Sequence, residues 1–383
     1  MKIAFDHQAF CLQKAGGISR YFCKLIEQLQ TMGEHAEVFA PVYRNQYLSS
    51  LPGNAVHGVK LSDYPPKMAG LSVALNGILS GTQIGKFQPD IIHETYFSKK
   101  GVGSSTCPRV LTVFDMIGEL ALDGVSLSQA QLRTSKKYQA VQRADRIICI
   151  SHATQVDLVR IFDVSPDKIC VIHLGCDQSA PSVGKTRVTE THGRPFLLFV
   201  GMRQGYKNFN PFLQAIASAP RLIRDFDVVA FGGGAFSADE MVFIQSLGFG
   251  HSQVSQISGD DERLANCYRN ASALVYPSLY EGFGLPPLEA MQHNCPVVCS
   301  KTSSIPEVVG EAGEYFDPTE TSDIATAIQT VVYSPERTQA LVELGLKQVA
   351  RFTWQNCADK HQRIYQELSS DHGRNLGISR SIK

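Results

Sequence analysis

The residues of this sequence best suited to chemistry lie in one segment, Tyr276–Met291, which reads YPSLYEGFGLPPLEAM. The segment predicts a strand that ends at Pro277, a glycine-containing loop, and a helix that begins with Pro286–Pro287, where a missing backbone N–H costs nothing. The amides of Gly284–Leu285 would then point outward from the positive end of a helix. Such helix ends bind phosphate and other anions, so the segment predicts an anion site.

Two carboxylates flank this predicted anion site. Glu281 lies in the loop and Glu289 in the first turn of the helix. A carboxylate repels a neighbouring diphosphate, whereas it accepts hydrogen bonds strongly from neutral hydroxyl groups. One glutamate on a ribose and the other on a sugar would therefore bracket a nucleotide-sugar. The alternative is that Glu281 is solvated and Glu289 only complements the helix dipole.

Two cations form a second candidate group. Arg203 and Lys207 lie four positions apart, in a loop that follows the predicted strand Phe196–Gly201 and precedes a helix. Cations at the carboxyl end of a parallel strand suit a diphosphate, and they would neutralise a departing diphosphate without a metal ion. Two solvated loop charges are the alternative.

Short apolar strands alternate with helical stretches, which predicts parallel sheets with right-handed crossovers. The predicted strands are Lys2–Phe5, Ala36–Ala40, Ile91–His93, Arg109–Phe114, Arg146–Ser151 and Ile169–His173, then Phe196–Gly201, Val228–Phe231, Gln253–Ser258, Ala273–Pro277, Pro296–Ser300 and Glu314–Phe316. A polar stretch rich in Gly, Ser and Thr, Ser179–Pro195, separates the two series and predicts a linker. The predicted fold class is α/β, with two Rossmann-like, doubly wound parallel-sheet domains facing each other across a cleft.

The length of 383 residues fits two such domains better than one core. We expect an N-terminal domain over residues 1–180 and a C-terminal domain over residues 181–352. A helix over residues 353–370 would cross back to the N-terminal domain, and residues 371–383 would form a flexible tail.

Composition narrows the function classes. Lys plus Arg and Asp plus Glu are equal at 36 each, so no overall positive field attracts nucleic acid. The ten cysteines include no CxxC pair, which favours a reduced, cytoplasmic chain over disulfides or zinc. The N-terminus lacks the pattern of a signal peptide, and no apolar run is long enough to span a bilayer. The basic stretch Leu127–Arg143 could rest on the anionic inner face of a membrane, with an ordinary solvated helix face as the alternative.

The two glutamates, separated by seven residues in Glu281–Glu289, resemble the pattern of the retaining GT-B glycosyltransferases of family 4. The resemblance extends over nearly the whole chain, from Gly16–Gly17 through Arg203 and Lys207 to Pro306–Val308. It is strong in the glutamate segment and weaker towards the N-terminus. The sequence looks closest to bacterial mannosyl- and rhamnosyltransferases of polysaccharide assembly.

The resemblance implies a role for each matched residue. Arg203 and Lys207 would hold the donor diphosphate, and Glu289 the ribose hydroxyls. Glu281 would hold the donor sugar together with four consecutive backbone positions, Gly282, Phe283, Gly284 and Leu285. Gly16 and Gly17 would let the N-terminal, acceptor-binding domain approach the phosphates, while the C-terminal domain binds the nucleotide-sugar. The resemblance also implies a hexosyltransferase that retains anomeric configuration and needs no further cofactor and no metal.

One departure from the family pattern concerns the strand end that reads TVFD over Thr112–Asp115. Family members often carry a histidine before this aspartate, and Phe114 takes its place, so no imidazole can act there. Asp115 remains a candidate for contact with the sugar or the acceptor, with a loop-capping role as the alternative. His93, at the end of a predicted strand, is a second cleft candidate, unless it is simply hydrogen-bonded in place.

The sequence does not identify the substrates. GDP-mannose is the first expectation for the donor, with UDP- and dTDP-sugars next, and a glycan or lipid-linked glycan is the expected acceptor. A GT-B-like sugar-nucleotide epimerase or phosphorylase, an NAD-dependent Rossmann enzyme and a non-catalytic sugar-binding protein are the alternatives. The run Gly232–Gly234 is not the complete GxGxxG that NAD binding requires. Asp260–Asp261 could suggest a metal site, but it more simply begins a helix with an N-cap.

Overall fold

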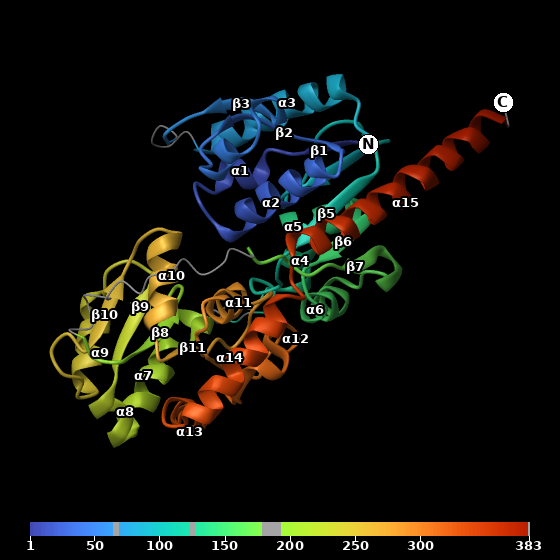
Figure 1. Ribbon diagram of the computed structural model, residues 1–383. Helices are drawn as coiled ribbons and strands as arrows, with labels where there is room; N and C mark the ends of the chain where they lie inside the picture. The colour runs from blue at the N-terminus through green and yellow to red at the C-terminus, as the bar shows by residue number, and fades with distance from the viewer. Residues whose placement is uncertain (64–68, 121, 123–126, 178–192, 382–383) are drawn as a thin grey trace. The chain divides into compact units, whose positions relative to one another are not determined.

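The computed structural model describes residues 1–63, 69–120, 122, 127–177 and 193–381, and its chain forms two compact units (Figure 1). Unit 1 consists of Met1–Glu119, Ser126–Gly175 and Trp354–Lys383, and unit 2 of Leu120–Val125 and Cys176–Thr353. All but the last three residues of the predicted linker lie outside the described residues.

Unit 1 is built on a parallel sheet of seven strands in the order β3-β2-β1-β4-β5-β6-β7. The strands are β1 (Lys2–Phe5), β2 (His35–Tyr43), β3 (Val56–Lys60), β4 (Ile91–Glu94), β5 (Arg109–Val113), β6 (Arg146–Cys149) and β7 (Ile169–Val171). The helices are α1 (Gln8–Leu12), α2 (Gly17–Thr31), α3 (Ala69–Phe87), α4 (Gln129–Thr134), α5 (Lys136–Arg143), α6 (His152–Phe162) and α15 (Trp354–Ser381), with 3-10 turns η1 (Tyr47–Ser50), η2 (Gly53–Ala55) and η3 (Pro166–Lys168).

Unit 2 is built on a parallel sheet of six strands in the order β10-β9-β8-β11-β12-β13. The strands are β8 (Phe196–Val200), β9 (Asp227–Phe231), β10 (Val254–Ile257), β11 (Ala273–Tyr276), β12 (Val297–Ser300) and β13 (Gly313–Phe316). The helices are α7 (Phe209–Ser218), α8 (Pro220–Asp225), α9 (Ala238–Ser246), α10 (Asp261–Asn270), α11 (Leu285–Gln292), α12 (Ile305–Val309), α13 (Thr321–Val332) and α14 (Pro335–Val349), with 3-10 turns η5 (Gly205–Lys207) and η6 (Gly310–Ala312).

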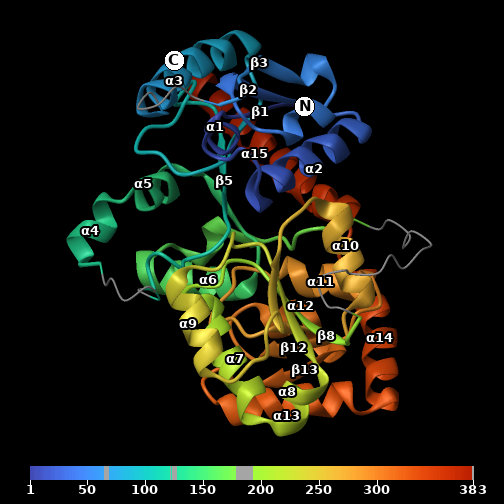
Figure 2. The ribbon, with the colours of Figure 1, turned by 90° about the vertical axis from the view of Figure 1, so that its left-hand side faces the viewer.

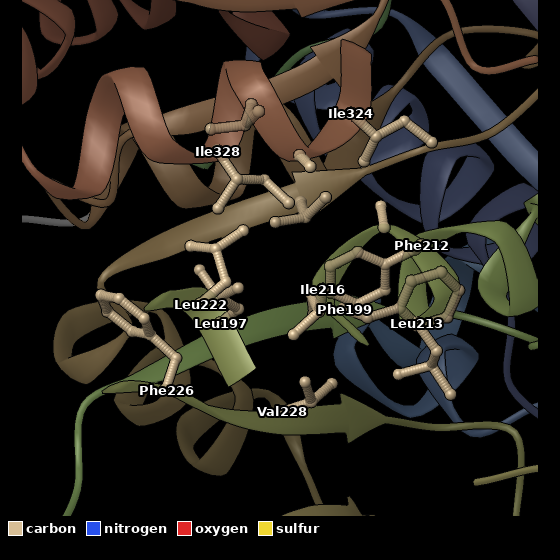
Figure 3. Close-up of a cluster of buried hydrophobic side chains, with 14 of the residues drawn as sticks. Leu197, Phe199, Phe212, Leu213, Ile216, Leu222, Phe226, Val228, Ile324 and Ile328 are labelled. Atoms are coloured by element: carbon tan, nitrogen blue, oxygen red, sulfur yellow. The ribbon is translucent and has the colours of Figure 1, made fainter. Parts of the chain in front are cut away.

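The central strands are apolar because helices cover both faces of each sheet. All five residues of β8 are buried, as is expected for a central parallel strand. In Figure 3, Phe199 of β8 lies beside Phe212 and Ile216 of α7, while Ile324 and Ile328 come from α13. These side chains belong to one buried cluster that fixes α7 and α13 on the sheet.

Each sheet has one point at which the strand order reverses. In unit 1 the chain moves outward in one direction from β1 and in the other from β4, and these two strands are neighbours. In unit 2 the corresponding neighbours are β8 and β11. Ligands of open parallel sheets bind at the carboxyl ends of the strands at such a point. Each unit therefore has a defined place at which to look for a site.

The structure contains every strand that the sequence predicts and adds β3 and α3. The stretch Leu127–Arg143, expected to be one helical segment, is divided into α4 and α5 by Ser135, whose side chain caps α5 by accepting the N–H of Tyr138 at 3.1 Å. The predicted N-caps Ser151 and Asp260 are both present, each accepting an N–H three residues on.

The C-terminal helix belongs to unit 1 and is longer than expected. The structure continues α15 to Ser381, so the tail predicted over residues 371–383 is helical as far as that residue. No proline interrupts the sequence after Trp354, and the helical backbone therefore continues without a stop.

Buried polar contacts dock α15 onto the sheet of unit 1. Tyr365 and His361 of α15 lie 2.6 Å and 2.7 Å from His93 and Tyr21. Thr112 of β5 connects the two pairs, 2.9 Å from His93 and 3.5 Å from Tyr21. All five side chains are 1% exposed or less. The docking of α15 is therefore polar and specific as well as apolar.

Within the described part of the chain, no helix is both long enough and apolar enough to cross a bilayer.

Candidate active site

The switch point of unit 2 brings together two of the predicted site residues. Lys207 follows β8, Glu281 follows β11, and Lys207 Nζ lies 2.6 Å from Glu281 Oε1. The two side chains are only 15% and 10% exposed. The sequence places these residues 74 positions apart, and the adjacency of the two strands is what joins them.

Two tyrosines surround the Lys207 ammonium. Its nitrogen lies 5.3 Å from the ring centre of Tyr206 and 5.5 Å from that of Tyr276, within the range of cation–π attraction. Burial raises the pKa of the Tyr276 phenol well above its usual range, and the Glu281 carboxylate raises it further. Tyr276 therefore stays protonated beside this carboxylate.

The loop that carries Glu281 is held by two serines that follow β12. The backbone N–H of Glu281 donates to Ser303 Oγ at 2.8 Å. Ser304 Oγ donates to the carbonyls of Glu281 and Phe283, both at 2.8 Å. Ser303 itself has a φ of 46°, a region that non-glycine residues occupy rarely and often at functional sites. The loop is thus fixed before any ligand arrives.

The N-terminus of α11 has the form that the sequence predicts. Gly284 is the N-cap, at φ 119°, and no side chain caps the helix. Pro286 and Pro287 have no N–H, so the amides of Gly284 and Leu285 are the N–H groups that this helix end offers. They follow directly after the loop of Glu281.

Glu289 lies one turn further along α11 and contacts a buried tyrosine. The hydroxyl of Tyr268, on α10, donates to Glu289 Oε2 at 3.0 Å. Burial raises the pKa of Tyr268 well above its usual range, and the charge of Glu289 adds to this. The tyrosine is therefore a fixed donor that orients the glutamate.

Arg203 has a different environment from that predicted for a diphosphate ligand. Its guanidinium donates to the carbonyls of Gly232, Gly234 and Ala235 at 2.9–3.1 Å, and to Glu240 at 2.7 Å and 3.2 Å. These contacts use all five of its N–H groups. In this structure Arg203 closes the glycine-rich turn after β9 and does not meet Lys207 in a shared cation pair.

The two candidates of unit 1 both make contacts within the fold. His93 is fully buried, with both ring nitrogens hydrogen-bonded as described above. Asp115 accepts the N–H of Ile117 at 3.1 Å, the geometry of a turn, and its carboxylate lies 3.9 Å from Lys137. Asp115 remains partly exposed at 37%, so a substrate contact is compatible with this position, whereas His93 has no open face.

Gly16 and Gly17 lie at the start of α2. Gly16 is the N-cap, and a Cβ there would lie 2.8 Å from Gln13 Oε1, the end of a flexible side chain that would have to shift. A Cβ on Gly17 would meet nothing within 4 Å. Their approach to a donor phosphate remains a prediction.

Two family models together match most of the chain. The model described as "Glycosyltransferase Family 4" matches residues 15–180, and the model described as "Glycosyl transferases group 1" matches residues 185–348. The chain belongs to the family 4, group 1 glycosyltransferases. The expected family and the expected GT-B fold class are thus confirmed.

Two relatives of this glycosyltransferase are themselves named as glycosyl- or mannosyltransferases. The O-antigen chain mannosyltransferase B of Escherichia coli is 28% identical over 60% of this chain and 63% of its own length. This chain therefore spans less than two thirds of that relative. The D-inositol 3-phosphate glycosyltransferase of Corynebacterium kroppenstedtii is 25% identical over 92% of this chain and 85% of its own length.

Solved structures share the fold. The sucrose-phosphate synthase of Thermosynechococcus elongatus has a TM-score of 0.73 at 20% identity, over 97% of this chain and 100% of that one. Anabaena HepE in complex with UDP has a TM-score of 0.69 at 19% identity, over 97% and 100%.

Sequence reasoning missed the residues that hold the glycosyltransferase site in place. Tyr268, Glu240 and the pair Ser303–Ser304 make the contacts that orient Glu289, Arg203 and the Glu281 loop. Two serines before Ile305-Pro306 have the pattern of a helix N-cap, yet Ser304, at the N-cap position of α12, makes no side-chain cap bond. It donates to the neighbouring loop instead, which no local pattern reveals.

Proposed function

We propose that this glycosyltransferase moves a hexosyl group, with mannosyl as the first expectation, from a nucleotide-diphosphate sugar to a hydroxyl of a glycan or lipid-linked glycan. The transfer would retain anomeric configuration and need no metal ion. The observation that carries the proposal is the contact between Lys207 and Glu281 at the switch point of unit 2, next to the uncapped N-terminus of α11.

This arrangement suits a diphosphate leaving group and a sugar together. The amides of Gly284 and Leu285 and the Lys207 ammonium offer positive charge to the diphosphate. Glu281 holds Lys207 in place before the donor binds, and its carboxylate accepts hydrogen bonds from the sugar hydroxyls. Glu289, oriented by Tyr268, accepts hydrogen bonds from the ribose.

We propose a same-face reaction at this site. The bond between sugar C1 and the diphosphate oxygen breaks with oxocarbenium character, and its electron pair goes to the diphosphate. The acceptor hydroxyl attacks C1 from the same face and passes its proton to the departing phosphate oxygen. Retention therefore needs no protein nucleophile, and the charge on the leaving group is stabilised by Lys207 and the helix end.

In this proposal Arg203 acts by holding a neighbouring turn in position. In this structure it fixes the turn Gly232–Ala235, which follows the strand next to β8. A direct contact between Arg203 and the diphosphate would require it to exchange its bonds to Glu240. Asp115, which remains partly exposed, is proposed to contact the acceptor or sugar.

Relatives support the substrate class. Two are named as mannosyltransferases, the second being the MMP α-(1→4)-mannosyltransferase of Mycolicibacterium hassiacum, 26% identical over 60% of this chain and 56% of its own length. Solved HepE complexes hold UDP, UDP-glucose or UDP and glucose. We therefore propose a GDP-mannose donor first and UDP- or dTDP-sugars next.

A cytoplasmic location with peripheral contact to the inner face of a membrane is part of the proposal. Contacts in α5 restrict the predicted basic face. Lys137 Nζ lies 2.6 Å from Glu119, and Arg143 is bonded to the buried Glu94 at 2.6 Å. Arg133 and Lys136 are exposed and are the cations of this face open to lipid phosphate.

A thermal-shift and donor-hydrolysis screen across GDP-, UDP-, dTDP- and ADP-sugars tests the proposal. We expect one nucleotide to stabilise the wild type and not Glu289→Ala, because the ribose contact is lost. Glu311→Ala, at an exposed carboxylate of the same unit, should respond like the wild type. A shift with NAD or free glycan, and none with any nucleotide-sugar, would refute the transferase assignment.

A further inference from the structure

Phe283, in the loop between Glu281 and α11, makes an aromatic contact inside unit 2. Its side chain is 3% exposed, and its ring centre lies 5.8 Å from that of Phe352, at an interplanar angle of 79°. Phe352 is 5% exposed. This is the edge-to-face geometry that aromatic pairs prefer. The loop therefore has an apolar anchor in addition to the hydrogen bonds from the two serines after β12.

Phe352 is held in place by the end of α14. Its N–H donates to the carbonyl of Val349, the last residue of that helix, at 2.9 Å. Gln348 is 8% exposed, and its Nε2 donates to the carbonyl of Val308 at 2.7 Å. Val308 belongs to α12, the helix that begins just after the two serines of the loop. The aromatic anchor and the hydrogen-bonding anchor of the loop are thus fixed to each other.

Helix α14 also packs on α11, the helix that follows the loop. The two helices are in contact and lie close together in Figure 2. Gly345 of α14 approaches Met291 of α11 so closely that a Cβ on the glycine would lie 2.9 Å from Met291 Cγ. Close packing of this kind resists sliding of one helix on the other. The ring of Phe352 therefore has a defined position relative to both ends of the loop.

The chain enters and leaves unit 2 beside Phe352. Cys176 begins the long segment of unit 2, and its N–H donates to the carbonyl of Phe352 at 2.9 Å. Two residues later the chain leaves unit 2 and starts α15 at Trp354. Within unit 1, a Cβ on Gly175 would lie 2.5 Å from the backbone nitrogen of Trp354, so this position has room only for glycine. The backbone of both crossing segments is thus tied down next to the aromatic anchor.

We propose that Phe352 is a positioning residue for the glycosyl transfer, because through Phe283 it sets the place of the Glu281 carboxylate and of the amides at the start of α11. The inference rests on the proposed function, which gives this loop the donor sugar and the diphosphate. Phe352 acts only through Phe283, so its loss misplaces the loop and removes no group that would contact the donor. A misplacement of about 1 Å can cost about 10²-fold in rate.

The first test is kcat for hydrolysis of GDP-mannose, or of the nucleotide-sugar that the thermal-shift screen selects, measured well below the Tm of each variant. Phe352→Ala should lower kcat by about tenfold or more. Phe352→Leu keeps an apolar side chain against Phe283 and should recover most of this loss. The thermal shift produced by the matching nucleoside diphosphate should persist in both variants, because the contact between Tyr268 and Glu289 does not involve Phe352.

Phe226→Ala is the matched control for loss of a buried ring. Phe226 is 6% exposed and pairs edge-to-face with Tyr333 of the same unit, with ring centres 5.9 Å apart. It directly precedes β9, at the amino end of the parallel strands, whereas the donor loop follows β11 at their carboxyl end. Phe226→Ala should lower Tm as Phe352→Ala does and leave kcat unchanged. An equal loss of kcat in both variants would show that Phe352 only stabilises the fold.

A second variant keeps the test decisive if Phe352→Ala does not fold. Gly175→Ala forces the backbone of Trp354 to shift, and the bond between Cys176 and Phe352 passes the shift to the loop. We expect a loss of kcat of about threefold or more. Gly53→Ala, at an exposed glycine where a Cβ meets nothing within 4 Å, should match the wild type. Wild-type kcat in Gly175→Ala or in a folded Phe352→Ala overturns the inference.

The same measurements separate this inference from the proposed function. If no nucleotide-sugar and no nucleoside diphosphate stabilises the wild type, the proposed function fails and the inference fails with it. If they stabilise the wild type and Phe352→Ala hydrolyses the donor at the wild-type rate, the positioning role alone fails.

Discussion

At the residue scale, Lys207 and Glu281 form a close ion pair at the switch point of unit 2. Under the proposed function, the donor diphosphate would approach this pair. The ammonium is held by the carboxylate and two aromatic rings, so it is placed before the donor arrives. Such preorganisation is what makes a charged group effective against a leaving group, because no reorganisation is needed during bond breaking.

Lys207→Met should therefore lower kcat/KM by about 10²–10³-fold, as removal of one preorganised donor typically does. It also leaves the Glu281 carboxylate without its cation and should lower Tm. The double variant Lys207→Met/Glu281→Gln removes this uncompensated charge, so we expect it to regain stability without activity. Lys347→Met, at an exposed lysine of α14, is the control. Full activity in Lys207→Met would contradict the assigned role.

Glu240 and Arg203 form another ion pair of unit 2, and this contact should make the stability of the fold depend on pH. The hydrogen bonds from Arg203 are the largest cause that lowers the pKa of Glu240 from 4.5 to about 2. A carboxylate with a lowered pKa stabilises the fold above its unfolded value, and this stabilisation is lost as pH falls through the folded value. Glu240→Gln should thus be less stable than wild type at neutral pH.

The difference in Tm between wild type and Glu240→Gln should shrink as pH falls from 4.5 towards about 2. Thermal unfolding across this window measures it, and a difference that does not change with pH would show that Arg203 does not hold Glu240 ionised. For Glu343→Gln, at an exposed glutamate of α14, the difference in Tm from the wild type should not change over this pH range.

At the scale of elements, the loop between β11 and α11 depends on the serines after β12. Ser304 is fully buried and supplies the hydrogen to two carbonyls of the loop. Ser304→Ala leaves both carbonyls without this donor, at a cost of about 1–3 kcal/mol. We expect a lower Tm, and a lower kcat because Glu281 loses its fixed position. Ser322→Ala on the exposed side of α13 should change neither, and normal kinetics in Ser304→Ala would contradict the positioning role.

Strands and helices could be predicted from the sequence where a local pattern of apolar residues determines them. Every predicted strand is present because apolar runs such as Phe196–Val200 are buried on both faces. The strand β3 was missed because it is a sheet edge whose five residues are all partly or fully exposed, so burial leaves no pattern in it. The helical tail after residue 370 was missed for a related reason, since two glycines lower the helix propensity of that segment without stopping the helix.

The surroundings of a site residue could be predicted from the sequence only where residues close to it in the chain form them. The N-terminus of α11 follows from Gly284 and two prolines in one segment. The environment of Arg203 does not, because Gly232 approaches it from the turn after β9 and Glu240 from α9. A charge pattern indicates that a cation is present and does not show which acceptor in the fold it meets.

For the molecule as a whole, the buried network under α15 joins the last helix of the chain to the first sheet. The direction of each bond follows from one carbonyl. Cys357 O can only accept, at 2.8 Å, so His361 Nδ1 carries its proton and Nε2 accepts from Tyr21. Thr112 must then donate to Tyr21 and accept from His93, whose Nδ1 accepts from Tyr365. This pattern satisfies every hydroxyl and ring nitrogen only while both histidines are neutral.

Burial keeps them neutral. It lowers the pKa of His361 from 6.5 to about 4 and that of His93 well below its usual range. In the unfolded chain both titrate near 6.5, so below this pH the unfolded state binds protons that the folded state does not. The stabilisation from the two neutral histidines is then fully present above pH 6.5. Below that pH the free energy of unfolding falls, by about 1.4 kcal/mol per pH unit for each histidine, towards about pH 4.

Urea unfolding of wild type and of His93→Phe/His361→Phe at a series of pH values between 7 and 4.5 measures this loss, within the window that the lowered pKa of His361 defines. The double variant should be less stable than wild type at neutral pH, because Thr112 and the two tyrosines lose partners. Its free energy of unfolding should nevertheless fall less steeply with acid, so the two curves converge. His251→Phe, at an exposed histidine of unit 2, should retain the wild-type slope. Parallel curves for the wild type and the double variant would show that α15 is not docked through neutral histidines.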